Sequence, residues 1–430
     1  MTALFSITHK MKRLLVICFL FNIVHSLPAQ DLRFDFSGQK LAKQWTAVAA
    51  KSVYTKETGF GYDFGTAGNT GQPAYFSASV PEGDYDIVLK IGSRAAAGNT
   101  TIKVESRRLL LSAIETKAGQ FVTKTFTVHV KSPLFSNGKK VSLKPREVNK
   151  LDWDDKFTIE INGSKPALTS LEIRRNSKAI TVFLAGNSTV VDQDDEPWAS
   201  WGQMIPAFFK QGVSISNHAE SGLSLGSFIG SHRLEKIMSE IRAGDYLFVE
   251  FGHNDQKEKG PEDGAFKSYT NRLRQFIAET RAKGAIPVLV TPTSRRSFDS
   301  TGTIFNSLGD YPAAMKKVAE EEKVALIDLN AMTTEMFQAM GNEPSKKAFV
   351  HYAAGTFPGQ EVALKDDTHF NSYGAYQIAK CIVKGIRSNH LALEKYLLPS
   401  PVFDPKKFDP FADWKLALSP KNSVIKPDGN

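Results

Sequence analysis

Short apolar runs alternate with helical patterns through residues 177–395, and this alternation limits the fold more than any other feature of the sequence. Between the runs, apolar residues recur at the spacing of an amphipathic helix, as at Leu234, Ile237 and Met238. Strands that alternate with helices are typical of a parallel sheet covered on both faces. We therefore predict a three-layer α/β/α domain with a flavodoxin-like sheet, whose strands lie in AITVFLAG, GVSISNHA, DYLFVEFG, AIPVLVTP and VALIDLN.

Residues 31–176 show a different sequence pattern. Their runs are short, rich in Val, Ile, Thr and Phe, and separated by Gly, Asn, Asp and Pro. Short strands with turn signals between them are typical of an antiparallel β-sandwich. We predict such a domain here, with strands in YDIVLKIG, NTTIKVE, FVTKTFTVHV, KKVSLKP, KFTIEING and LTSLEIRR.

Both ends of the chain are distinct from these two domains. Residues 1–30 combine three basic residues, the apolar stretch LLVICFLFNIV and the sequence HSLPAQ, which is the order found in a secretory signal peptide. The apolar stretch is too short for an ordinary membrane span. We therefore expect a secreted or periplasmic protein that is not inserted in the membrane after cleavage. Residues 396–430 are rich in Pro and aromatic residues, and we expect them to pack as an extended strap.

Cysteine content and charge exclude some classes of protein. Of the two cysteines, Cys18 lies in the predicted signal peptide, so Cys381 would have no intrachain partner. Loss of Lys10, Lys12 and Arg13 with the signal lowers the formal net charge from +9 to +6. This charge is spread along the chain without a run of Lys or Arg, which argues against a nucleic-acid partner. It is compatible with an acidic polysaccharide.

Polar residues follow the ends of three predicted strands. Ser188 follows the first, Gly222 the second and Asn254 the third, and KDDTHFN (365–371) is predicted as a loop before the last helix. If the strand order is 2-1-3-4-5, the first strand lies between the second and the third, so their ends adjoin. We therefore expect these side chains and loops to surround one site.

These residue types suit acyl transfer. A serine needs a base to become a nucleophile, and that base needs a carboxylate to orient it. Ser188, His369 and Asp366 can supply these groups, although Asp367 competes with Asp366 and only the D-x-x-H spacing favours the latter. The oxyanion that develops needs hydrogen-bond donors. The sequence therefore predicts acyl transfer through a serine nucleophile, a mechanism that needs no metal and no cofactor.

The same blocks carry a family resemblance. GNST (186–189), the glycine of NHAESGLS, GHND (252–255) and DDTH (366–369) resemble, in order, the four signature blocks of the SGNH (GDSL-type) hydrolases. Asn187 departs from the commoner Gly-Asp-Ser, and with TPTSRRSF and DDTHFNSYG this resembles the rhamnogalacturonan acetylesterase branch. The resemblance, over residues 178–390, implies that Ser188 is the nucleophile, His369 the base and Asp366 its orienting carboxylate. It also implies an oxyanion hole formed by Ser188, Gly222 and Asn254.

The resemblance implies a function. We expect an exported serine esterase that removes acetyl groups from a plant cell-wall polysaccharide, with rhamnogalacturonan as the expected substrate. Another SGNH-type esterase, acting on xylan, lipids or thioesters, and a non-catalytic glycan-binding protein remain alternatives. The N-terminal region resembles the galactose-binding-like sandwiches attached to such esterases, and it either binds glycan or has a structural role.

Three residues are candidate substrate contacts. Arg295 and Arg296 follow the fourth predicted strand, where a guanidinium can bind a substrate carboxylate. A solvated arginine pair is the alternative. His253 of GHND is also a candidate contact, with a structural role as its alternative.

Two rival sites compete with this interpretation. GLSLG (222–226) matches the nucleophile elbow of α/β-hydrolases, which would make Ser224 the nucleophile. An elbow serine follows its strand directly, whereas NHAES separates the apolar run from Gly222. A metal phosphoesterase site would combine His253, Asp255, Asp366 and His369, but two-metal sites usually need more ligands.

Overall fold

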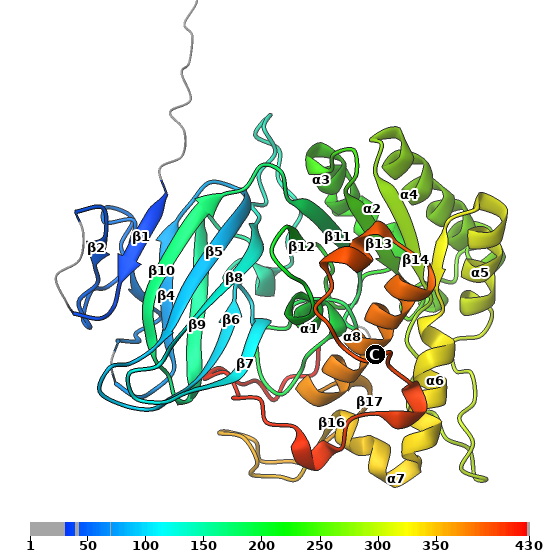
Figure 1. Cartoon of the computed structure of the whole chain (residues 1–430). Helices are drawn as coiled ribbons and strands as arrows, with labels where there is room; N and C mark the ends of the chain where they lie inside the picture. Colours follow the sequence, from blue (N-terminus) through cyan, green and yellow to red (C-terminus); the bar gives the residue numbers. More distant parts are fainter. Residues whose placement is uncertain (1–30, 39–42, 69, 428–430) are drawn as a thin grey trace, which may run out of the picture. The chain divides into compact units, whose positions relative to one another are not determined.

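The computed structural model describes residues 31–38, 43–68 and 70–427 (Figure 1). The predicted signal peptide lies outside the described residues. The described residues from Asp31 onward form one compact unit. Within the described ranges, no helix is both long and apolar enough to cross a membrane.

The N-terminal part is a β-sandwich, as predicted. Alternate residues of its strands, such as Ile87 and Leu89, are fully buried and share one hydrophobic cluster with Phe76 and Phe157 of the other sheet. All neighbouring strands are antiparallel except the first two in the chain. One sheet has the order β2 (Thr46–Ala47), β1 (Leu32–Asp35), β10 (Leu168–Arg175), β5 (Gly83–Gly92) and β8 (Phe121–Val130). The other has the order β3 (Phe60–Asp63), β4 (Ala74–Ser79), β9 (Lys156–Lys165), β6 (Gly98–Val104) and β7 (Arg108–Thr116).

The predicted strand KKVSLKP (139–145) is wrong. Residues 131–155, between β8 and β9, form an irregular connection whose only regular element among the described residues is the 3-10 turn η1 (Pro145–Glu147). Pro145 cannot donate a hydrogen bond to a β-ladder. The neighbouring Lys144 instead donates to the carbonyl of Ser221 in the α/β part.

The α/β part contains the predicted parallel sheet. Its first strand lies between the second and the third, so the 2-1-3-4-5 order is confirmed (Figure 1). The carboxyl ends of these three strands therefore adjoin. The order is β12 (Val213–Asn217), β11 (Ile180–Gly186), β13 (Tyr246–Glu250), β14 (Ile286–Val290) and β15 (Ala325–Ile327).

Helices cover both faces of this sheet. Phe183 and Ala185 of β11 belong to one hydrophobic cluster, whereas Val182 and Leu184 belong to another. Because strand side chains alternate between faces, the two clusters mark the two sides of the sheet. The first cluster includes α2 (Leu225–Gly230), α3 (Arg233–Glu240), α4 (Thr270–Ala282) and α5 (Tyr311–Glu322). The second includes α1 (Trp201–Met204), α6 (Leu329–Met340) and α8 (Ser372–Ser388).

The segment KDDTHFN is not the loop predicted from its polar composition. Residues Leu364–Phe370 form β17, which pairs antiparallel with β16 (Phe349–Tyr352) in a separate two-stranded sheet. Its polar residues carry no strand signal of their own. The segment is a strand because it pairs with β16, which lies earlier in the chain. The pairing holds this segment directly before α8.

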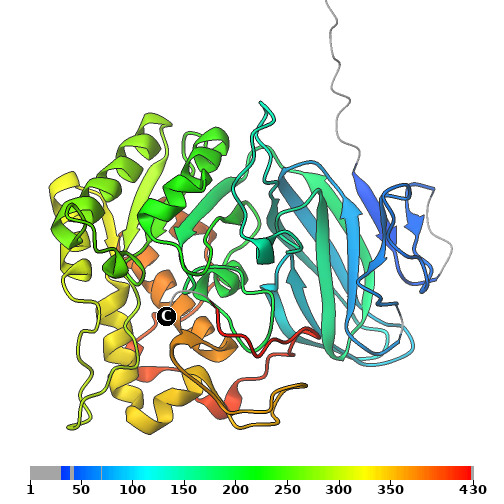
Figure 2. The same cartoon turned by 180° about the vertical axis from the view of Figure 1, so that it is seen from behind.

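The C-terminal residues pack against both parts of the chain. Trp414 contacts Tyr376 of α8, with ring centroids 4.8 Å apart, and Phe403 is buried. Further on, the Lys103 ammonium donates to the carbonyl of Ala417, and the N–H of Ser419 donates to Glu196 (Figure 2, red segment). The domain boundaries at residues 176 and 395 remain predictions.

A buried ion cluster joins β8 to the α/β part. His129 Nδ1 lies 2.9 Å from Asp84 Oδ1, and its Nε2 lies 3.6 Å from Glu240 Oε2. Asp84 also accepts hydrogen bonds from Thr181 and Ser214 of the parallel sheet. Burial alone would lower the pKa of His129, but these two carboxylates outweigh it and raise the pKa to about 9.

This cluster predicts a pH-dependent stability. A histidine whose pKa is raised in the folded state stabilises fully below its unfolded pKa, about 6.5, and loses this contribution as the pH rises through 9. His129 should therefore contribute about 3 kcal/mol to the free energy of unfolding at pH 6, and little above pH 9. Denaturant unfolding from pH 6 to above pH 9 should show that His129→Gln no longer loses this stability as the pH rises. The variant His232→Gln, at an exposed histidine, should lose it as the wild type does. Parallel curves for wild type and His129→Gln would contradict the assignment.

Candidate active site

Ser188 lies in the turn directly beyond β11. The turn is shaped by Asn187, whose carbonyl accepts from the N–H of Val190 (3.0 Å) and whose Oδ1 accepts from the N–H of Thr189 (3.1 Å). Ser188 is nearly buried, at 4% exposure. Among the described residues, no hydrogen bond involves its N–H or its hydroxyl. Both groups are thus left available to a bound molecule.

A buried carboxylate supports this turn. Glu250, the last residue of β13, accepts hydrogen bonds from the Thr189 hydroxyl (2.9 Å), the N–H of Thr293 (3.2 Å) and the indole N–H of Trp201. Burial raises the pKa of Glu250 to about 7. The sequence analysis missed this residue. Its only signal is an acidic residue at the end of an otherwise apolar run.

Gly222 lies in a loop that contacts the two neighbouring blocks. The N–H of Glu220 donates to the carbonyl of Gly186 (3.3 Å), and Asn254 Nδ2 donates to the carbonyl of Leu223 (3.1 Å). Gly222 has φ +80°, which favours glycine. Within the described part of the chain, its N–H takes part in no hydrogen bond. The structure therefore brings the first three blocks together.

His369 and Asp366 form a buried pair on β17. His369 Nδ1 lies 2.7 Å from Asp366 Oδ2, and Asp366 Oδ1 accepts from the backbone N–H groups of Thr368 and His369. Burial would raise the pKa of Asp366, but its bonds to His369 and these amides outweigh burial and hold it well below its usual range. The N–H of Ala199, in the segment that follows Ser188, donates to the carbonyl of Phe370 (2.8 Å).

The two competing aspartates have different partners. Asp367 Oδ1 accepts from Arg296 Nη1 (2.9 Å) and lies 2.7 Å from His351 Nε2. Asp366, not Asp367, therefore contacts His369. Arg296 also donates to Asn342 (2.8 Å), so its guanidinium is already engaged.

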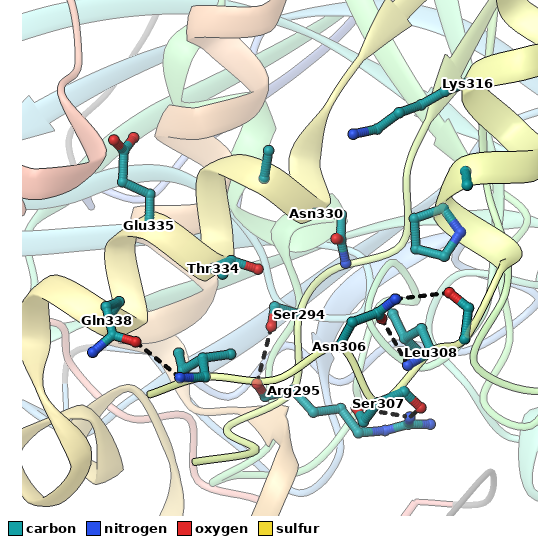
Figure 3. A pocket seen from close by; sticks show the side chains of 15 residues that line it. Ser294, Arg295, Asn306, Ser307, Leu308, Lys316, Asn330, Thr334, Glu335 and Gln338 are labelled. Carbon is teal, nitrogen blue, oxygen red and sulfur yellow. Dashed lines mark hydrogen bonds between the residues drawn. The ribbon is translucent and has the colours of Figure 1, made fainter. Parts of the chain in front are cut away.

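Arg295 differs from its neighbour. Its guanidinium donates weakly to Ser307 (3.3 Å), as Figure 3 shows, and no carboxylate pairs with it among the described residues. Burial lowers the pKa of Arg295. Burial also lowers the pKa of Lys257, and the charge of Arg295 lowers it further. A cavity of about 600 Å³ lies beside Arg295, lined by Ser294, Asn306 and Asn330 among others. Neither Ser188 nor His369 lines this cavity.

His253 is buried, at 2% exposure. Burial, together with the charges of Arg295 and His369, lowers its pKa well below the ordinary value, so the ring is neutral. A contact of His253 with substrate stays a prediction.

The structure places the rival serine in a different role. Ser224 caps α2, because its hydroxyl accepts from the N–H of Ser227 (3.2 Å) and donates to Glu258 (2.6 Å). As for a metal centre, the described residues contain no group of three or more His, Cys, Asp or Glu that could hold an ion.

Lys426 is a further residue that the sequence analysis missed. Its ammonium lies 3.6 Å from Asp366 Oδ2 and contributes to the lowered pKa of Lys257. The C-terminal strap thus reaches the His369–Asp366 pair. No local motif distinguishes this lysine from other surface lysines.

Comparisons with known proteins agree with this arrangement. Residues 184–375 match the GDSL-like Lipase/Acylhydrolase family. Rhamnogalacturonan acetylesterase RhgT of Bacillus subtilis (strain 168) is 42% identical over 223 residues, which are 51% of this chain and 95% of that protein. Probable rhamnogalacturonan acetylesterase YesY of the same organism is 34% identical over 220 residues, covering 50% of this chain and 97% of that protein.

A third relative aligns along most of the chain. Uncharacterized esterase YxiM of Bacillus subtilis (strain 168) is 25% identical over 414 residues, covering 88% of this chain and 97% of that protein. That alignment is too long for the α/β part alone. The parallel sheet, the first three blocks beyond its strand ends and the extent of these matches all indicate the same family. The chain belongs to the GDSL-like lipase/acylhydrolase family, the SGNH hydrolases, and is a serine carboxylic ester hydrolase.

Proposed function

We propose that this protein is an exported carbohydrate esterase that removes acetyl groups from rhamnogalacturonan through an acyl-enzyme on Ser188. The observation that carries the proposal is the buried His369–Asp366 pair on β17. This strand is linked to the segment after Ser188 by the hydrogen bond from Ala199 to Phe370. The names of two relatives, RhgT and YesY, support the substrate. The signal-like residues 1–30 support export.

The geometry supports a two-step reaction. Ser188 Oγ attacks the acetyl carbon while His369 takes its proton, and the oxygen that becomes negative is stabilised by donors that are otherwise unused. The backbone N–H groups of Ser188 and Gly222 and the second amide hydrogen of Asn254 are such donors. His369 then returns the proton to the sugar oxygen, which leaves, and water attacks the acetyl-enzyme by the same route.

Asp366 acts through His369. Its carboxylate accepts from Nδ1 and so keeps the base lone pair on Nε2. Because the pKa of Asp366 lies well below its usual range, the carboxylate stays ionised wherever a histidine titrates. The ionised partner also stabilises the imidazolium that forms in each step.

Cations near the site favour an acidic polysaccharide. Burial lowers the pKa of Lys257, and the charges of Arg295 and Lys426 lower it further. The ammonium of Lys426 also lies 3.6 Å from Asp366 Oδ2. Arg295 has no carboxylate partner among the residues described, whereas Arg296 is paired with Asp367. We therefore assign a uronate contact to Arg295 and a structural role to Arg296.

Acetate release from acetylated rhamnogalacturonan and acetylated xylan tests the substrate. We expect faster release from rhamnogalacturonan, and we expect Arg295→Met to raise its KM about 10-fold or more, the cost of a charge-assisted hydrogen bond. The same variant should hydrolyse 4-nitrophenyl acetate, which has no carboxylate, at the wild-type rate. Lys316→Met is the matched control. Lys316 also lines the cavity, but its ammonium is already paired with Asp328. Faster release from xylan, with no effect of Arg295→Met, would instead favour a xylan esterase.

A further inference from the structure

The irregular connection between the two sheets of the β-sandwich contacts the loop that carries Gly222. Lys144 Nζ donates to the carbonyl of Ser221 at 2.6 Å, and Arg146 Nη2 donates to the same oxygen at 2.8 Å. Arg146 Nε also donates to Glu220 Oε1 at 2.9 Å. Lys150 Nζ donates to Glu220 Oε2 at 2.9 Å. Three cations from the sandwich thus hold two consecutive residues next to Gly222.

The connection is itself anchored. Glu147 and Arg233 of α3 form a fully buried ion pair, in which Arg233 Nη2 donates to both carboxylate oxygens. Arg233 also donates to the carbonyl of His218, four residues before Gly222. Glu147 accepts in turn from the N–H of Lys144. Lys144 and Arg146, which bind the loop, therefore belong to a segment that is itself anchored to α3.

Glu220 links this segment to the catalytic sheet. Its carboxylate is 1% exposed and receives Lys150 and Arg146, while its N–H donates to Gly186 at the end of β11. Burial would raise the pKa of Glu220, but Lys150 and Arg146 outweigh burial and lower it to about 2. The carboxylate therefore stays charged, and the contact persists across the pH range of a serine esterase.

The orientation of one peptide bond follows from these contacts. In a trans peptide the C=O and the N–H point in opposite directions, and the bond between Ser221 and Gly222 is trans. Two cations bind its carbonyl on one side, so the N–H of Gly222 must face the other. Hydrogen bonds to a carbonyl also polarise its peptide unit and strengthen the opposite donor.

We propose that Lys144 and Arg146 are positioning residues, which hold the Ser221–Gly222 peptide so that the N–H of Gly222 faces the oxyanion. The proposal rests on the role proposed above for Gly222. It gives residues 131–155 of the sandwich a part in the chemistry.

The test uses the full chain and 4-nitrophenyl acetate, a neutral ester that offers no carboxylate to a cation. Lys144→Met, Arg146→Met and the double variant should still fold, because Lys144 is only partly buried, Arg146 is exposed and Lys150 still pairs with Glu220. Loss of the Arg146 contact with the buried Glu220 should lower the melting temperature, so kcat is compared at a temperature at which every variant is folded. We expect the double variant to lose about 10- to 100-fold in kcat with KM within twofold, since a misplaced oxyanion donor costs up to this much. Arg146→Lys should restore part of the loss. Lys139→Met, in the same connection but paired with the exposed Glu235, is the control.

Three results would overturn the proposal. A double variant whose kcat stays within twofold of wild type would show that the loop needs no such support. In a parallel assay on acetylated rhamnogalacturonan, a change confined to KM for that substrate would show that the two cations bind substrate instead. Wild-type kcat in Ser188→Ala would overturn the proposed function and this proposal together. The first two results would leave the proposed function intact.

Discussion

Replacing Ser188 with alanine is expected to lower kcat for acetyl-ester hydrolysis about 10⁶-fold, the cost of deleting the nucleophile of a serine hydrolase. Without its hydroxyl no acyl-enzyme forms, and only binding and the oxyanion donors remain. Acetate release measured beside thermal unfolding checks the result. The melting temperature should not change, because no hydrogen bond of this hydroxyl exists among the described residues.

Ser224→Ala is the matched control for this experiment. Its hydroxyl caps α2 and donates to Glu258, so we expect a small loss of stability and a kcat within about 10-fold of wild type. The reverse outcome, in which Ser224→Ala is inactive and Ser188→Ala is active, would replace the proposed site with a nucleophile elbow.

Asp366→Asn is expected to lower kcat about 10⁴-fold, because an asparagine favours the wrong tautomer of its histidine partner. The loss should appear in kcat at every pH, since the variant removes the acceptor for His369 Nδ1. Asp367→Asn is the control from the next residue. It weakens contacts with Arg296 and His351 only, and should change kcat less than about 10-fold. A fully active Asp366→Asn would remove this carboxylate from the mechanism.

The fold was predictable wherever the signal was local. The runs around β11, β12 and β13 are bounded by turn residues and separated by helical periodicity, so their order and the adjoining strand ends followed from general rules. Two segments were assigned wrongly because their conformation depends on distant partners. KKVSLKP resembles a strand but binds the loop at Ser221, and KDDTHFN resembles a loop but pairs with Phe349–Tyr352.

The site shows the same limit. Ser188, Gly222 and Asn254 follow strands that adjoin, so sequence reasoning could bring them together. Glu250 could not be recognised, because its partners Thr189 and Thr293 come from two other blocks of sequence. Lys150 and Arg146 pair with Glu220 across about 70 positions of sequence. Buried ion pairs of this kind have no local sequence pattern.

The arginine pair shows what the structure adds to a prediction made from sequence. Arg295 and Arg296 are an adjacent pair after TPTS, and the sequence does not distinguish them. The structure separates them, since Arg296 pairs with Asp367 whereas Arg295 bonds only to Ser307 among the described residues. Only their partners distinguish a candidate substrate contact from a structural residue.

The central claim, an acyl-enzyme on Ser188, is tested most directly by locating a covalent adduct. The protein is treated with a fluorophosphonate probe, digested, and the modified peptide is sequenced by mass spectrometry. We predict a single adduct on Ser188 of the peptide that contains GNST, labelling that disappears in Ser188→Ala, and labelling that persists in Ser224→Ala. An adduct on Ser224, or undiminished labelling of Ser188→Ala, would contradict the account.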